Sequence, residues 1–381
     1  MLIRRTDATT IHRLYFFVSI LTITFTLCVY AQPQLKPGFD AEEYLALLSL
    51  NFYGNSIADS NVRKTQKDVY TKLYTSPEVG LKNQWSLYLR EDNVAAITVR
   101  GTVASPVSWS ANFYAAMIAA QGTLQLNDTT LFSYKLAADK QAYVHVGWTV
   151  ALASMAPDIV AKIKDLYGKG VRHFYLSGHS QGGAITYLLR SYLYYLQQDG
   201  TLPNDIVFKT YCSAAPKPGN MFYAYDYEFI NRGGWAFTVV NRSDWVPESP
   251  YTIQRLQDMN DLNPLIHTKS LLKKQSLLVR IVGGALYNKL YRKPRKAQEV
   301  YTHYLGKVLY KKSINKELKD FKEPEYVASV NYMRAGTPIV LMPDEEYHQI
   351  FKEKGSEFKD YFVHHQFDAY YLLIKKQYLN Q

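Results

Sequence analysis

Between residues 94 and 244, the spacing of apolar residues changes repeatedly between the pattern of a strand and the pattern of a helix. Short runs typical of buried strands are followed by longer stretches typical of helices. Two strands that pair in parallel need such a crossover helix between them. The pattern therefore predicts an α/β fold in which helices cover both faces of a mostly parallel central sheet. The expected strands are 94–99, 174–176, 206–211 and 235–240, and the expected helices are 149–167, 184–198 and 223–230.

Segments on either side of this region predict further elements. Residues 84–89 and 94–99 alternate around a polar turn, which predicts a β-hairpin. Asp40 precedes an apolar stretch that ends at residue 49, and an acid stands at the third helical position, which is typical of a helix start. Three more elements are expected: a polar loop at 122–130, a second hairpin at 328–332 and 336–341, and a closing helix at 367–379.

The first 31 residues predict a signal peptide. Three arginines precede an apolar segment, 14–29, and Ala31 ends an A-x-A-like cleavage site. An uncleaved anchor helix is the alternative, since 14–31 approaches membrane-spanning length. A lipoprotein attached through Cys28 is a weaker alternative, because a bulky leucine precedes that cysteine. We expect an exported protein, periplasmic, envelope-associated or extracellular, in which residues 32–381 form a single domain.

Cysteine usage bears on the compartment. Cys212 is the one cysteine outside the leader, so the mature chain has no internal disulfide. This usage is more typical of a bacterial envelope enzyme than of a secreted eukaryotic one. The sequence has neither Cys and His at metal-ligand spacing nor a Gly-rich phosphate loop before a helix. No metal and no cofactor is therefore expected.

Charge is concentrated in one insertion that interrupts the strand–helix pattern. Residues 251–325 hold 16 Lys or Arg and 7 Asp or Glu, whereas the whole chain carries a formal +11. Within it, 269–296 contains nine basic residues and no acid, interleaved with Leu, Val and Ile. That composition is typical of basic helices that lie on anionic membranes, but a helical cap with a solvated basic rim is the favoured structural interpretation. Nucleic acid is a weaker candidate partner, because no aromatic-on-basic module is present.

A strand–turn–helix pattern surrounds Ser180. Gly178-x-Ser180-x-Gly182 stands between the expected strand 174–176 and the helix after it, the arrangement of a nucleophile elbow. Glycines on both sides allow the strand and the helix to approach closely. A chance match in a Gly/Ser turn is the alternative, and the flanking strand and helix weigh against it.

A serine nucleophile needs a base and an orienting carboxylate. Asp244 comes after the strand 235–240, so we expect it at the same sheet edge as Ser180. Its alternative is an ordinary turn aspartate. By chain order the base should come later, and His364 and His365 both lie just before the closing helix.

The oxyanion that forms during acyl transfer needs two fixed donors. The backbone N–H of Gln181, at the start of the helix, is one candidate. Thr102 comes after Gly101 just beyond the strand 94–99, and we expect its backbone N–H as the second donor and its hydroxyl as a third.

Five ordered motifs resemble those of the class 3 (fungal-type) lipase family. The resemblance covers about 85–250 and the tail from 328, and it implies an α/β-hydrolase fold with Ser180 as nucleophile and Asp244 as acid. It also implies an oxyanion-hole role for Thr102. The family's catalytic histidine stands five residues before a tyrosine, which His365 and Tyr370 match, so His365 is favoured over His364. The motifs are Arg100-Gly101-Thr102, Val144-His145-Val146-Gly147-Trp148, Gly178-His179-Ser180-Gln181-Gly182-Gly183, Ala215-Pro216-Lys217-Pro218-Gly219-Asn220 and Val240-Asn241-x-x-Asp244-x-Val246-Pro247.

Together these features predict a serine ester hydrolase that acts on lipid acyl esters and resembles a triacylglycerol lipase. Phospholipase A1 and short-chain or feruloyl esterase are the alternatives within this chemistry. A membrane-surface binding protein on a hydrolase scaffold is the alternative outside it, with 269–296 holding an anionic membrane. The long gap between Asp244 and His365, which the basic insertion creates, departs from the family pattern and leaves the substrate open.

Overall fold

The computed structural model describes residues 35–52, 70–352 and 357–379. The chain divides into two units, Met1–Lys36 and Pro37–Gln381. The expected signal peptide, 1–31, lies outside the described residues. All helices and strands of the described residues belong to the second unit.

A seven-stranded sheet forms the centre of this unit, and its last five strands are parallel. The hairpin expected before residue 100 supplies two of the three strands at one edge, and these three pair antiparallel. The strand order confirms the expected α/β fold with a mostly parallel central sheet. In spatial order the strands are β1 (Tyr70–Thr75), β2 (Trp85–Arg90), β3 (Val94–Val99), β8 (His173–His179), β9 (Val207–Ser213), β10 (Ala236–Asn241) and β11 (Thr337–Leu341).

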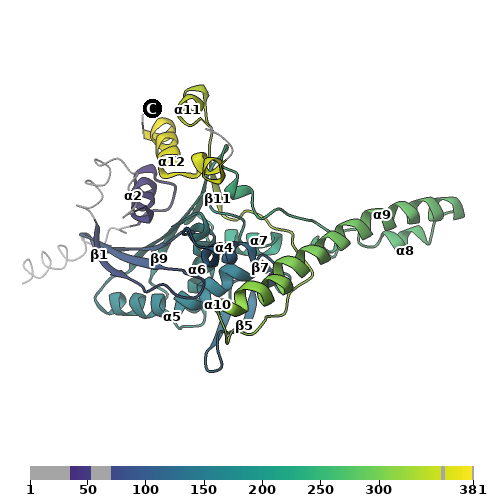
Figure 1. Ribbon diagram of the computed structural model, residues 1–381, viewed down its shortest axis with the longest axis horizontal. Helices are drawn as coiled ribbons and strands as arrows, with labels where there is room; N and C mark the ends of the chain where they lie inside the picture. The colour runs from purple at the N-terminus through teal and green to yellow at the C-terminus, as the bar shows by residue number, and fades with distance from the viewer. Residues whose placement is uncertain (1–34, 53–69, 353–356, 380–381) are drawn as a thin grey trace, which may run out of the picture. The chain divides into compact units, whose positions relative to one another are not determined.

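Helices cover both faces of the sheet (Figure 1). On one face lie α2 (Ala41–Asn51), whose first N–H groups are capped by the Asp40 carboxylate, and α12 (Phe367–Ile374). On the other face α6 (Gln181–Gln198) packs on β3, β8 and β9, with α5 (Val146–Gly168) and α7 (Met221–Ile230) against it. The helix expected at 149–167 thus begins three residues earlier.

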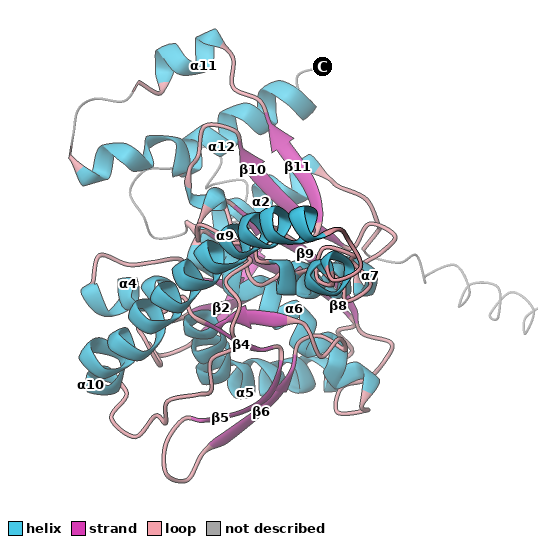
Figure 2. Cartoon of the chain, turned by 90° about the vertical axis from the view of Figure 1, so that its right-hand side faces the viewer, coloured by secondary structure: helices cyan, strands magenta, loops and turns pink. Residues whose placement is uncertain are grey.

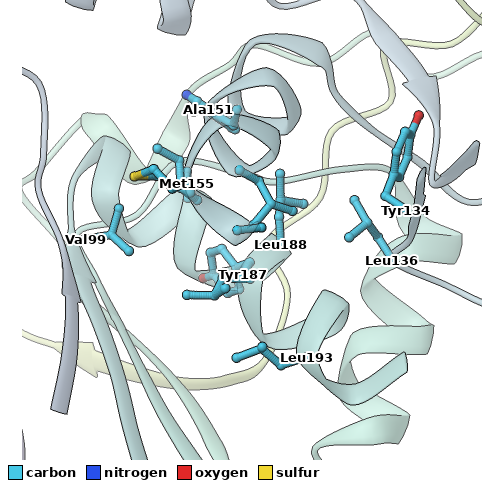
Figure 3. Close-up of a cluster of buried hydrophobic side chains, with 14 of the residues drawn as sticks. Val99, Tyr134, Leu136, Ala151, Met155, Tyr187, Leu188 and Leu193 are labelled. Atoms are coloured by element: carbon cyan, nitrogen blue, oxygen red, sulfur yellow. The ribbon is translucent and has the colours of Figure 1, made fainter. Parts of the chain in front are cut away.

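The main hydrophobic core lies between α5, α6 and the sheet. Its side chains include Val99 from the sheet, Met155 from α5 and Leu188 from α6 (Figure 3). Within the described residues, α5 is the one helix long and apolar enough to span a membrane, but most of it is buried inside the protein. It is a core helix.

Two expectations about secondary structure were wrong. Residues 122–130 are not one loop, because β5 (Gln121–Gln125) pairs with β6 (Leu131–Lys135). Leu124, Phe132 and Tyr134 point into the core and hold this hairpin, although its outer face is polar. Residues 336–341 do not form a hairpin with 328–332: β11 instead pairs in parallel with β10, after a turn at Gly336 with φ +81°. Small elements between β3 and α5 are α4 (Pro106–Phe113), β4 (Met117–Ala119) and β7 (Tyr143–His145).

The basic insertion is helical, as expected. Its longest element is α9 (Leu277–Thr302; Figures 1 and 2). The short α8 (Thr268–Leu272) lies beside its N-terminal half (Figure 1). The helix continues past residue 302 through two π-helical segments and returns the chain to the core, where Ile314 is fully buried. The remaining elements are η1 (Val246–Glu248), η2 (Leu256–Asp258), η3 (His303–Val308), η4 (Tyr310–Ile314), α10 (Asn315–Glu317), α11 (Glu345–Ile350), η5 (Phe358–His365) and η6 (Lys375–Leu379).

Candidate active site

Ser180 stands at a sharp turn between β8 and α6 with φ +61° and ψ −131°. Residues other than glycine rarely adopt such a backbone, which costs on the order of 1–3 kcal/mol. The turn is anchored by the Ser180 N–H, which donates to the Ser213 carbonyl on β9 at 2.9 Å. A Cβ on Gly178 would lie 2.3 Å from the Gly182 backbone, and a Cβ on Gly182 would lie 2.1 Å from the Val99 carbonyl oxygen. The close approach expected from the glycines is therefore confirmed.

Asp244 and His365 form a buried pair. Asp244 lies just after β10, and His365 ends η5 just before α12. The His365 Nδ1 lies 2.7 Å from Asp244 Oδ2, which also accepts a 2.7 Å hydrogen bond from the Tyr370 hydroxyl. The Val246 N–H donates to Asp244 Oδ1 at 3.0 Å. The carboxylate thus accepts from three donors.

These donors control the protonation of the carboxylate. Burial alone would raise the pKa of Asp244, but the facing His365 and the hydrogen bonds from His365, Tyr370 and Val246 outweigh burial and hold the pKa below its usual value. Asp244 is therefore ionised at neutral pH, with its charge against the His365 imidazole.

His179, the residue before Ser180, holds the backbone of His365. Its Nε2 lies 2.8 Å from the His365 carbonyl oxygen, and its Nδ1 lies 3.0 Å from Ser213 Oγ. Because a carbonyl only accepts, Nε2 must carry the proton, so neutral His179 accepts at Nδ1 from the Ser213 hydroxyl. Burial lowers the pKa of His179 to about 3, with a smaller contribution from His365, which agrees with a neutral ring. Ser213 in turn accepts from Tyr44 on α2, at 2.7 Å.

The neighbouring histidine has different contacts. His364 Nδ1 lies 2.9 Å from the Tyr347 hydroxyl, and its carbonyl accepts from the Asn241 side chain at 3.0 Å. Of the two histidines that the sequence left open, the structure therefore brings His365 to Asp244 and places His364 against Tyr347.

Thr102 and Gln181 meet beside Ser180. The Thr102 hydroxyl donates to Gln181 Oε1 at 2.7 Å and accepts from Asn112 Nδ2 at 2.9 Å. Its proton is thus engaged, and the expectation that this hydroxyl serves as a third oxyanion donor is not met in this structure. The backbone N–H of Gln181 belongs to the first turn of α6, where N–H groups lack partners within the helix.

His145, which precedes Ser180 in the chain, has a structural position. It is fully buried, stacks on Trp148 with 3.6 Å between ring centroids, and contacts the Asn112 carbonyl through Nε2 at 3.1 Å. The Asn112 side chain also accepts from Trp148 Nε1 at 3.0 Å. This cluster fixes Asn112, and through it the Thr102 hydroxyl.

One cavity of about 820 Å³ joins these groups. Ser180 and His365 both line it, although no direct hydrogen bond forms between these two described side chains. Most of its wall is apolar and aromatic, and the wall comes from several elements: Trp109 and Phe113 of α4, Trp148 of α5, Trp245 and Tyr251 after β10, Tyr301 of α9, Leu305 of η3 and Phe362 of η5.

Sequence reasoning missed several residues of this site. It assigned no role to His179, used Tyr370 only as a spacing marker, and did not single out Asn112. Asn112 is an isolated amide within an apolar stretch, which is a usable signal for a buried hydrogen-bonding role. Tyr44 lies far from the motifs in sequence, so no local pattern could have linked it to His179.

The arrangement has the parts of an acyl-transfer site: a serine in a strained turn, a histidine–carboxylate pair and backbone donors beside an apolar cavity. In the part of the chain that the structure describes, no group of three His, Cys, Asp or Glu side chains could hold a metal ion.

Comparison with known proteins gave one family. The model described as "Lipase (class 3)" matches residues 96–254. A search of curated proteins found no match.

Similar solved structures are lipases from fungi. The Rhizomucor miehei lipase propeptide complex is 20% identical, with 57% of this chain and 66% of that chain covered and a TM-score of 0.40. The mono- and diacylglycerol lipase from Aspergillus oryzae is 16% identical, with 56% and 75% covered and a TM-score of 0.41. Lipase II from Rhizopus niveus is 15% identical, with 55% and 72% covered and a TM-score of 0.39. The aligned part thus spans just under two thirds of the Rhizomucor miehei chain.

Proposed function

We propose that this chain is a member of the class 3 lipase family, whose model matches residues 96–254, and that it hydrolyses lipid acyl esters. One observation supports this most strongly: Ser180, in a strained turn, shares an apolar cavity with His365, which is paired at 2.7 Å with the ionised Asp244.

In the proposed reaction Ser180 Oγ attacks the ester carbonyl carbon while His365 Nε2 takes its proton. Asp244 fixes the tautomer of His365, with the proton on Nδ1, and stabilises the imidazolium. The backbone N–H groups of Thr102 and Gln181 hold the oxyanion. The C–O bond to the alcohol then breaks, and His365 donates its proton to the leaving oxygen.

Hydrolysis of the acyl-enzyme repeats these steps with water. His365 takes a proton from the water as its oxygen attacks the acyl carbon, and the bond to Ser180 Oγ breaks. The proton returns to Ser180 and the fatty acid leaves. No cofactor enters this scheme.

The cavity supports a long-chain substrate. About 820 Å³ of mostly aromatic and aliphatic wall suits an acyl chain better than a polar acid. We therefore favour a triacylglycerol-like ester, with a phospholipid cleaved by phospholipase A1 chemistry as the second candidate. Short-chain and feruloyl esters remain the alternative with a smaller acyl group.

If the substrate is a lipid, the protein must reach the compartment and the lipid surface that contain it. We propose a peripheral contact between 269–296 and an anionic membrane, and export through residues 1–31, because lipid esters reside in membranes and emulsions. A binding protein without catalysis is the competing function. Such a protein would need no base beside Ser180, yet His365, which is paired with the Asp244 carboxylate, lines the same cavity as Ser180.

A panel of p-nitrophenyl esters from C2 to C16 tests this function. We expect hydrolysis with a preference for acyl chains of eight carbons or more, and loss of at least about 1,000-fold in kcat in Ser180→Ala. A preference for C2 to C4 would favour the short-chain esterase. A folded wild type without hydrolysis on any chain length would contradict the proposal.

A further inference from the structure

The helix α9 exposes most of its length, including eight large apolar side chains. Of its 26 residues, only Tyr287, Gln298 and Tyr301 are buried. It packs against α8 and continues directly into η3, and Figure 1 shows it extending away from the central sheet. Such a helix leaves a large apolar area in water unless another surface covers it.

Four of its eight exposed large apolar residues form one stripe. Val279, Val282, Leu286 and Leu290 are spaced by three, four and four residues, so at 100° per residue they fall within an arc of about 80°. Their exposed fractions are 47%, 60%, 58% and 63%. We call these four residues the α9 stripe. It extends over about 16 Å of helix at 1.5 Å per residue.

Cations border the α9 stripe. Lys289 and Lys293 lie on the turns beside Leu286 and Leu290, and 269–296 holds nine basic residues and no acid. Among the described residues, Arg295 alone of these nine forms a salt bridge, to Glu299. An apolar stripe flanked by cations that are not neutralised by the protein is complementary to an anionic lipid surface.

A second apolar cavity, of about 380 Å³, opens between α8 and α9. Leu272 lines it from α8, and Leu286 and Leu290 line it from the stripe. The stripe is thus continuous with a mostly apolar recess, whose lining also includes Arg255, Tyr287 and Tyr291. Such a recess favours acyl chains over a flat protein surface as the occupant.

The C-terminal end of α9 reaches the catalytic cavity. Tyr301 and, beyond it, Leu305 line that cavity, and Tyr301 stands about 33 Å along the helix from Val279. One continuous helical element therefore connects the exposed stripe with the cavity that contains Ser180.

We propose that α8 and α9 form a docking element for anionic phospholipid bilayers. α9 lies in the plane of the interface, with the α9 stripe between headgroups and acyl chains and the lysines at the phosphates. Resting on the proposed lipid ester hydrolysis, this docking brings the mouth of the catalytic cavity to the surface that contains the substrate.

Sedimentation with vesicles tests the docking without any catalysis. The full chain with Ser180→Ala is mixed with vesicles of phosphatidylcholine alone or with about 30% phosphatidylglycerol. We expect at least about tenfold tighter binding to the anionic vesicles, with affinity falling as salt rises. The pair Leu286→Gln and Leu290→Gln should weaken this binding at least about tenfold, and Lys289→Glu with Lys293→Glu should weaken it further for the anionic vesicles.

Leu262→Gln is the matched control, because Leu262 is 89% exposed but lies outside the stripe. It should bind like the parent. Equal binding by the parent and both double variants, no binding to anionic vesicles, or dimerisation through the stripe in ultracentrifugation would overturn the docking proposal. Hydrolysis of a soluble ester by the stripe variants reports separately on the catalytic function, and it should be unchanged.

Discussion

Replacing Asp244 by asparagine changes one charge and almost no volume, so its effect depends on the hydrogen bonds that the side chain accepts. The carboxylate accepts from three donors: the His365 Nδ1–H, the Tyr370 hydroxyl and the Val246 N–H. An amide accepts only on its oxygen. If that oxygen stays on the Val246 N–H, the amide NH₂ faces His365, which must then present a bare Nδ1.

The tautomer of His365 determines the size of the effect. With Nδ1 bare, the imidazole proton moves to Nε2, the nitrogen that must accept the Ser180 proton. The same change in the Ser-His-Asp template lowers kcat about 10⁴-fold, which corresponds to about 5.4 kcal/mol at 1.36 kcal/mol per tenfold. We expect a loss of this order in Asp244→Asn, with KM changed much less.

The assay is the steady-state hydrolysis of a soluble p-nitrophenyl ester, with circular dichroism as a check on folding. Tyr370→Phe is the matched control, because it removes one donor and keeps both the charge and the His365 contact. We expect its kcat to fall about tenfold or less. If folded Asp244→Asn retained more than a tenth of the wild-type kcat, the assignment of Asp244 as the orienting acid would be refuted.

Three further predictions concern stability. Ser180→Gly should unfold with a free energy about 1 kcal/mol higher than Ser180→Ala in urea, because glycine relieves the strain at φ +61°; equal stability would argue against strain. Gly182→Ala should lower the free energy of unfolding by more than about 3 kcal/mol, because the new Cβ would lie 2.1 Å from a backbone oxygen. Gly168→Ala is the control: a Cβ there would have no neighbour within 4 Å, so the free energy of unfolding should change by less than about 1 kcal/mol. His179 stays neutral in the folded protein, with a pKa of about 3, but takes a proton near pH 6.5 in the unfolded chain. The free energy of unfolding should therefore fall as the pH drops from about 6.5 towards 3, and His179→Gln should reduce this pH dependence by up to about 1.4 kcal/mol per pH unit. An unchanged pH dependence in His179→Gln would count against a buried neutral ring.

The sequence could place Ser180 and Asp244 at the same end of the sheet, because the carboxyl ends of parallel strands lie on the same side. Ser180 and Asp244 each come after a short apolar run, and the structure places them after β8 and β10. The partner of β10 was not predictable in the same way. The alternation of residues 336–341 fits a hairpin or a parallel edge strand equally well, and only the open edge of β10 decides between them.

Side-chain contacts between distant segments were the other limit. His364 and His365 are equivalent by local pattern, and their difference lies in which one reaches Asp244, 121 residues away in the chain. The Thr102 hydroxyl was expected at the oxyanion, but its proton goes to the Gln181 side chain. A conformation of that kind depends on side-chain packing, which residue spacing does not encode.

Covalent labelling of Ser180 tests the central claim most directly. The full-length wild type is treated with a fluorophosphonate, and the adduct is located by peptide mass spectrometry, with Ser180→Ala as the control. We predict one adduct, on the peptide that contains Ser180, and none in Ser180→Ala. A folded wild type that stays unlabelled, or one labelled equally in Ser180→Ala, would contradict the assignment of Ser180 as the nucleophile.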